Sequence, residues 1–320
     1  MISDKNEAMS NQKNDSLARD TSIDPFAGRI VVGMDGSEGS VKAARWAVRE
    51  ARARGRGITL THAIMPTTAS SAFGISAPPR LDLIDDLRNG SIEHLTRIAA
   101  DLDCTDVDVV VEIGTPSALL LTASDTADLL VIGSRGRGGF AALLLGSVGS
   151  QVASHSSCPV IVMRDDPRLD AQEIVVGLDG SSHSVAALDF AFDEASRHGF
   201  SIIAVHAWDV PSFDVIITPD GPVPLPLEHS ADNEARLTAE ILAGYTEQYP
   251  DVDVVEHLVR ASAVHALLKA ATNAAMIVVG TRGRGAALGA LLGSTSNAVL
   301  HKAKVPVAIV PVPPQELEAA

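Results

Sequence analysis

Two glycine-rich segments with identical spacing are the residues of this sequence best suited to hold a ligand. The first is Gly133-Ser-Arg-Gly136, followed after nine residues by Gly146-Ser147; the second is Gly280-Thr-Arg-Gly283, followed after nine residues by Gly293-Ser294. Glycine lets main-chain N–H groups approach an anion, and a Gly-Ser pair that opens a helix adds N–H donors, a hydroxyl and the positive end of the helix dipole. The pattern therefore predicts phosphate binding; a flexible connection with an ordinary serine cap is the alternative.

The residues present exclude two better-known phosphate motifs. A P-loop needs a lysine after its glycines, and residues 133–140 contain none. A dinucleotide-binding G-x-G-x-x-G follows the first strand of its domain, whereas Gly136-x-Gly138 follows the expected fourth strand.

An aspartate lies in the Asp-Gly-Ser segment after the first expected strand of each half, at Asp35 and Asp179. A carboxylate repels a triphosphate unless Mg²⁺ bridges the two or the carboxylate faces ribose or base donors. We expect ligand contact, directly or through Mg²⁺, or a capping role for the next helix, and both can hold. Arg135 and Arg282 could contact phosphate or lie exposed on their loops.

These motifs recur because the chain is an internal repeat. IVVGMDGS at 30–37 returns as IVVGLDGS at 174–181, and LVIGSRGRGGFAALLLGS at 130–147 returns as IVVGTRGRGAALGALLGS at 277–294. A period this long indicates two complete domains. We expect a polar tail over 1–28, one domain at 29–165, a polar linker at 165–171, a second domain at 172–312 and a tail at 313–320.

Short apolar runs alternate with amphipathic stretches in each half, which predicts α/β domains with doubly wound parallel sheets and helices on both faces. Ligands bind such sheets beyond the carboxyl ends of the strands. In the first half we expect strands at 29–34, 58–63, 107–113, 129–132 and 160–163, and helices at 40–54, 83–102, 116–126 and 147–156. The second half, 173–310, repeats this scheme of five strands and four helices, with a long loop at 211–226 and a helix near 229–249. The apolar last strands, 160–163 and 305–310, would be exposed edges, so we expect them to pair with each other and make the monomer a pseudo-dimer. Two such chains could form a homodimer.

Composition narrows the function classes. The 320 residues carry a net charge of −15 and no useful basic run, which argues against nucleic-acid and anionic-membrane partners. Cys104 and Cys158 are too few for a disulfide framework or a zinc site of their own. The polar N-terminus lacks a secretory apolar region and no apolar run reaches the roughly 20 residues of a membrane span, so we expect a cytoplasmic protein.

The pattern G-x2-G-x9-G-S after the fourth strand, with V-x-G-x-D-G-S at the first, resembles the universal stress protein family, and more closely its tandem members common in actinobacteria. The resemblance covers residues 29–312. It implies five-stranded sheets of order 3-2-1-4-5 and ATP, with or without Mg²⁺, in a cleft between the loops after strands one, two and four.

Carried over by position, the resemblance implies a set of ATP-binding residues in each half. The first-half set is Gly33, Asp35, Ala63, Gly114, Gly133, Ser134, Arg135, Gly136, Arg137, Gly138, Gly139, Gly146, Ser147 and Val148. The second-half set is Gly177, Asp179, Ala207, Ala261, Gly280, Thr281, Arg282, Gly283, Arg284, Gly285, Gly293, Ser294 and Thr295.

The two halves differ at positions that could give their sites different affinities. Ala261-Ser-Ala263 replaces Gly114-Thr-Pro116, and the extra methyl could narrow the second pocket. Gly149 stands where the second half has Ser296, so the first site lacks one hydroxyl donor.

The resemblance therefore implies an ATP-binding regulatory protein of stress or dormancy physiology. We expect slow ATP hydrolysis at most, because no phosphate-loop lysine or obvious base is present. An interaction scaffold with vestigial sites, above all in the second half, is the alternative. A nucleotidyl transferase or ATP pyrophosphatase is disfavoured, since S-G-G-x-D-S and H-I-G-H signatures are missing near the first strand.

Overall fold

The computed structural model describes residues 24–65, 81–136, 145–164, 168, 170–208, 215–218, 221–224, 227–284 and 292–312. We refer to the described residues up to 164 as the first half and to those from 170 onward as the second half. The predicted tails at 1–23 and 313–320 and most of the predicted linker lie outside these ranges.

The first half forms the predicted alternation of strands and helices. Its elements are β1 (Ile30–Gly33), α2 (Glu38–Arg54), β2 (Ile58–Ile64), α3 (Leu81–Asp101), β3 (Val107–Ile113), α4 (Pro116–Ser124), β4 (Leu129–Gly133), α5 (Ser147–His155) and β5 (Val160–Met163). Local sequence sets the helix ends: Ser37 caps the start of α2, and Gly55, at φ 62°, ends it in the left-handed conformation. The parallel strands lie in the order β5-β4-β1-β2-β3, as the family resemblance implied.

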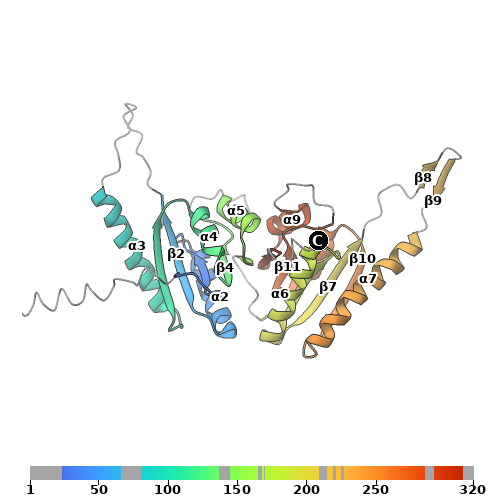
Figure 1. The fold of residues 1–320 in the computed structure, drawn as a ribbon, viewed down its shortest axis with the longest axis horizontal. Coiled ribbons are helices and arrows are strands. Elements are labelled where there is room, and N and C mark those ends of the chain that lie inside the picture. The colour runs from blue at the N-terminus through green and yellow to red at the C-terminus, as the bar shows by residue number, and fades with distance from the viewer. Residues whose placement is uncertain are drawn as a thin grey trace, which may run out of the picture.

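The second half repeats this arrangement and adds a hairpin. Its repeated elements are β6 (Glu173–Leu178), α6 (Ser182–His198), β7 (Ser201–Trp208), α7 (Leu227–Gln248), β10 (Val254–Arg260), α8 (Ala263–Ala270), η2 (Ala271–Asn273), β11 (Met276–Gly280), α9 (Ser294–Lys302) and β12 (Val307–Val310). The prediction of a long loop over 211–226 was wrong in part. β8 (Val215–Thr218) and β9 (Gly221–Pro224) pair antiparallel inside it, and Gly221 has a positive φ of 119°. The hairpin lies apart from the main sheet (Figure 1).

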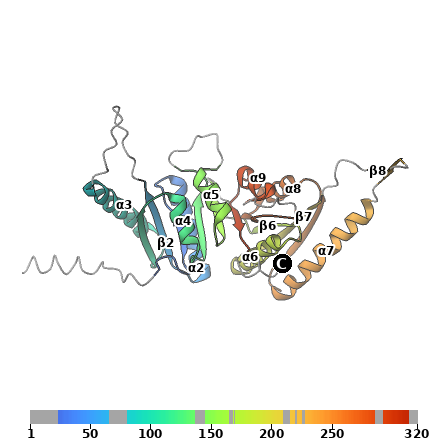
Figure 2. The same cartoon turned by 45° about the horizontal axis from the view of Figure 1, so that its top comes forward.

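The two halves share one ten-stranded sheet. β12 pairs antiparallel with β5, placing Ala308 opposite Ile161, and this is the predicted pairing of the last strands. Strand pairing removes two apolar edges from solvent, because each would otherwise expose unpaired main-chain groups. Figures 1 and 2 show the two halves side by side.

Two apolar layers cover the sheet, one on each face. One layer joins the strands to α2, α3, α6 and α7, and the other joins them to α4, α5, α8 and α9. Alternate residues of β1 enter different layers: Ile30 and Val32 lie in the first and Val31 in the second, all fully buried. This two-sided burial explains why the strands are continuous runs of Val, Ile and Leu.

Residues 24–28, which we assigned to the N-terminal tail, pack on the first half. Phe26 is buried, and the Gly28 N–H donates to the Thr126 carbonyl at 2.8 Å. Residues before 29 therefore also pack on this half. No helix among the described residues is both long and apolar enough to cross a membrane.

Candidate functional site

A cavity of about 540 Å³ opens at the carboxyl ends of β1, β2 and β4, where the sequence predicted the ligand. Its size lies within the usual range for small-molecule sites, about 300–1,000 Å³. Ten predicted residues line it: Gly33, Asp35, Ala63, Gly133, Ser134, Arg135, Gly136, Gly146, Ser147 and Val148. Arg137, Gly138 and Gly139 lie outside the described residues.

The cavity also has an apolar wall that the motif reasoning missed. It includes Met34, Leu119, Leu120, Ile132 and Leu145, beside Thr61 and His62 of β2 and Pro116 of α4. These residues flank the motifs on the same strand ends and on α4. Their position on the parallel sheet could have identified them, but glycine spacing alone could not. A site with one apolar wall and one glycine-rich wall can accommodate a ligand with an apolar ring and an anionic chain.

The start of α5 is unusual among the helices whose first residues the structure describes. Its N-cap is Gly146, and no side chain caps it; α9 begins in the same way at Gly293. In contrast, side-chain hydroxyls cap α2, α4, α6 and α8, from Ser37, Thr115, Ser181 and Ser262.

The first intrahelical hydrogen bond of α5 runs from the Ser150 N–H to the Gly146 carbonyl, at 3.1 Å. The N–H groups of residues 147–149 therefore have no partner within the helix, and all three residues line the cavity. The Gly146 N–H donates to the Ser134 carbonyl at 2.9 Å, which fixes this helix start against the end of β4. The arrangement forms a preorganised anion site.

Asp35 organises the loop after β1 instead of capping α2. Its Oδ1 accepts hydrogen bonds from the Ser37 N–H at 3.0 Å and the Ser37 hydroxyl at 2.6 Å, while Ser37 itself caps the helix. A Cβ on Gly136 would lie 2.8 Å from Asp35 Oδ2. The glycine is therefore required for the close approach of the two loops, and the capping alternative for the aspartate was wrong.

Positive charge gathers on the β4 side of the cavity. Arg135 lines it, and Arg164, which the sequence analysis did not single out, follows β5 and is buried. Burial, together with the neighbouring charge of Arg135, lowers the pKa of Arg164 to about 10. Arg164 also donates to the Leu300 carbonyl in α9 and so connects the two halves. In a chain of net charge −15, this local cationic environment favours an anionic ligand.

Several side chains contact one another in the equivalent region of the second half. The Arg284 guanidinium packs against Gly180, where an added Cβ would overlap it, and lies 3.7 Å from Glu234 of α7. Glu234 Oε2 also forms a hydrogen bond with His206 Nε2 at 2.8 Å.

Two further contacts hold this second loop in place. The Arg284 N–H donates to Asp179 Oδ2 at 2.9 Å, and Arg282 Nε donates to His183 Nε2 at 3.0 Å. Burial opposes ionisation of Asp179, but hydrogen bonds from Ser181 and Arg284 outweigh it and lower the pKa of this carboxyl. Burial and the charge of Arg282 lower the pKa of His183, consistent with a neutral, accepting imidazole.

The remaining predicted second-half residues have contacts of their own. Gly177 packs against Leu267 and Val279, Thr281 is buried, and Gly280 lies against the His183 backbone. Gly293, Ser294 and Thr295 form the uncapped start of α9, while Ala207 packs beside the core and Gly283 fits against Asp179. Gly285 lies outside the described residues.

Two sequence differences between the halves do not have the effects on their sites that we expected. Gly114 does not line the cavity, and nothing lies within 4 Å of a Cβ added to it, so Ala261 does not narrow the second site as expected from that position. The hydroxyl of Ser296 is buried and donates to the Gly280 carbonyl at 2.6 Å. It is therefore used inside the fold, and the expectation of an extra ligand donor was wrong.

Comparison with known proteins gives one consistent result. The model of the universal stress protein family matches the chain twice, at residues 27–164 and 171–311. A universal stress protein of Mycolicibacterium smegmatis is 37% identical over 289 residues, covering 88% of this chain and 96% of the relative. One from Mycobacterium tuberculosis is 37% identical over 297 residues, with the same coverage.

Solved structures agree with the fold. A universal stress protein from Archaeoglobus fulgidus superposes with a TM-score of 0.66 at 22% identity, covering 91% of this chain and 98% of that one. A putative universal stress protein from Pseudomonas aeruginosa gives a TM-score of 0.57 at 16% identity, covering 92% and 98%. The repeated motif, the doubled sheet and these matches together establish that this chain belongs to the universal stress protein family, as a tandem member with two copies of its domain.

Proposed function

We propose that the first half binds ATP and that the protein acts as a nucleotide-responsive regulator in a stress or dormancy response. The observation that carries this proposal is the uncapped, glycine-led start of α5 on the wall of a 540 Å³ cavity. Phosphate oxygens would accept hydrogen bonds from the N–H groups of residues 147–149 and would be attracted by the positive charge of Arg135. The apolar wall around Ala63 and Leu120 would receive the adenine ring.

Mg²⁺ would enter this site through a carboxylate. Both Ser37 hydrogen bonds go to Asp35 Oδ1, and Oδ2 faces the loop at Gly136, on the phosphate side of the cavity. The nucleotide would bind one conformational or oligomeric state more tightly than the other and would thereby shift the equilibrium between the two states. The sequence places no lysine in residues 133–149, and we therefore assign no phosphoryl-transfer role to this loop.

A scaffold function is the second candidate for the second half. Arg284 contacts Gly180 and Glu234 beside the Asp179 loop, and we propose that these contacts hinder nucleotide binding there. We expect the second half to bind ATP more weakly than the first, or not at all.

Nucleotide content tests both statements. The purified protein is denatured and its released nucleotides are separated by chromatography, and the stripped native protein is then titrated with ATP, with and without Mg²⁺. One tight site per chain supports the proposal, and a tighter titration with Mg²⁺ supports the Asp35 assignment. Two equal sites would show that the second half binds ATP as well as the first. No recovered nucleotide and no response to millimolar ATP would leave the scaffold as the function.

A further inference from the structure

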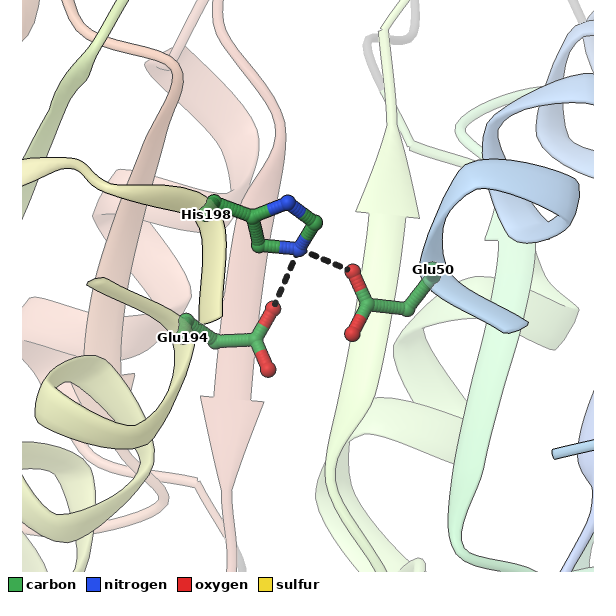
Figure 3. A group of neighbouring side chains, drawn as sticks. All are labelled: Glu50, Glu194 and His198. Atoms are coloured by element: carbon green, nitrogen blue, oxygen red, sulfur yellow. Dashed lines mark hydrogen bonds and ion pairs between the residues drawn. The ribbon is translucent and has the colours of Figure 1, made fainter. Parts of the chain in front are cut away.

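Two glutamates are buried where the two halves meet. Glu50 on α2 is 1% exposed and Glu194 on α6 is fully buried. The two glutamates are 144 residues apart and so occupy equivalent positions of the repeat. Helices α2 and α6 contact each other where the halves meet at the β5–β12 seam. Four residues later, α2 carries Arg54 and α6 carries His198. Figure 3 shows the two carboxylates and the imidazole directed toward one another.

Arg54 and His198 contact different oxygens of the two carboxylates. Arg54 donates to Oε1 of Glu50 and to Oε1 of Glu194, and its third nitrogen donates to Asp128 at 3.0 Å. The two Oε2 atoms face His198 Nε2, at 3.0 Å from Glu50 and 3.8 Å from Glu194 (Figure 3). Within the part of the chain that the structure describes, Glu194 Oε2 has no hydrogen-bond partner.

A second guanidinium contacts the same oxygen of Glu194, because Arg197 Nη1 lies 3.3 Å from Glu194 Oε1. The arginine contacts with these two glutamates therefore all go to Oε1 atoms. The two Oε2 atoms lie on the side of His198, which is where a cation would bind.

The donor atoms suit a transition-metal ion better than a hard cation. The two Oε2 atoms and His198 Nε2 lie within 4.8 Å of one another. In a tetrahedral zinc site with bonds of about 2.0 Å, donors are roughly 3.3 Å apart, and the two separations from His198 bracket that value. An imidazole among carboxylates favours Zn²⁺ or its first-row neighbours over Mg²⁺ and Ca²⁺.

A cavity of about 60 Å³ adjoins this cluster and supplies an open coordination position. Glu50 and His198 line it, together with Trp46 and Phe200. The cavity has room for a water ligand, which would complete a four-coordinate site, and it gives an ion a path from solvent. Arg54 would then act from outside the coordination sphere by orienting both carboxylates through their Oε1 atoms.

We propose that Glu50, Glu194 and His198 bind one divalent first-row transition ion, represented by Zn²⁺, and thereby clamp the two halves together. The ion takes ligands from α2 of one half and α6 of the other. Loading with the ion therefore stabilises the arrangement of the halves about the β5–β12 seam. This site is separate from the nucleotide cavity and independent of the proposed function.

Zinc binding by the full-length chain tests the proposal. The protein is stripped with a chelator, freed of nucleotide, and titrated with Zn²⁺ alone in competition with a fluorescent zinc chelator. We expect one tight site per chain. His198→Gln and Glu194→Gln should each weaken it by about 100-fold or more, beyond the 10–100-fold loss typical of a supporting outer-shell group. His155→Gln, which removes an exposed histidine of α5, is the matched control and should retain the tight site.

A spectroscopic measurement on the unmodified chain guards against variants that fail to fold. Co²⁺ in place of Zn²⁺ should give the visible absorption bands of a four-coordinate N,O site, and Zn²⁺ should displace them. Zn²⁺ should also raise the unfolding temperature of the parent chain. Absence of a tight zinc site in the parent, or equal binding by the parent and a folded His198→Gln variant, would overturn the proposal and leave a buried ion-pair network that holds a proton instead.

Discussion

A negative charge placed at the start of α5 should have opposite effects on folding and on nucleotide binding. Ser147 is the first residue of α5, is exposed, and lines the cavity. An acidic residue in the first turn of a helix is stabilising by about 0.3–1 kcal/mol, because it faces the positive end of the dipole. Ser147→Asp should therefore raise the unfolding temperature of the nucleotide-free protein, by at most about 4 °C.

The same carboxylate would repel a bound phosphate chain. At a separation of roughly 5 Å and an effective dielectric constant near 20, two unit charges repel by about 3 kcal/mol. Solvent and salt screen this exposed position, which reduces the expected loss to about 1–2 kcal/mol. The variant should thus bind ATP about 5–30-fold more weakly in the first half.

Isothermal titration with ATP and thermal unfolding with and without ATP measure both effects on one sample. Ser147→Ala separates loss of the hydroxyl from gain of charge, and Ser294→Asp places the same charge at the start of α9 in the second half. If Ser147→Asp stabilises the protein while leaving its ATP affinity unchanged, the start of α5 does not hold phosphate.

Three further outcomes follow from the contacts described above. Gly280→Ala should destabilise the second half by about 1–3 kcal/mol in denaturant unfolding, because the added Cβ would overlap the backbone at the start of α6. Gly133→Ala should destabilise the first half less, since the nearest contact of its added Cβ is 3.2 Å away, and equal losses of stability would refute this difference. Burial raises the pKa of the Cys158 thiol to about 11, so at pH 8 a thiol reagent should label native protein at Cys104 far faster than at Cys158, and comparable rates would contradict the buried environment. Arg284→Ala should open the second half and strengthen ATP binding there, counted as a second site in the titration; an unchanged stoichiometry would show that this side chain does not block it.

Much of the fold could be predicted from local sequence. The two V-x-G-x-D-G-S segments showed the repeat, and the alternation of apolar runs with amphipathic stretches gave both parallel sheets, because burial on two faces selects uninterrupted Val, Ile and Leu. The edge argument also identified the pairing of β5 with β12. The hairpin at 215–224 was missed, because a proline-rich segment carries little strand signal.

The candidate site was predicted in its polar half only. Glycine spacing predicted the helix start at Gly146 and the loop at Gly133–Gly136, because glycine's freedom in φ and its lack of a Cβ are properties of the residue itself. The wall from Leu119 and Leu120 depends on how α4 packs on the sheet, which spacing along the chain does not encode. The sequence also could not show that Ser296 turns inward to the Gly280 carbonyl.

The sequence alone determined the repeat, the fold family and the places where main-chain donors are uncovered, because these depend on residue type and short-range periodicity. Tertiary structure alone decided that Arg284, Glu234 and Gly180 meet in the second half, since they lie on separate segments of the chain. It also decided that Glu50 and Glu194, on helices 144 residues apart, share one guanidinium and one imidazole. Charges on distant segments interact strongly only when the fold brings them together and removes the water between them.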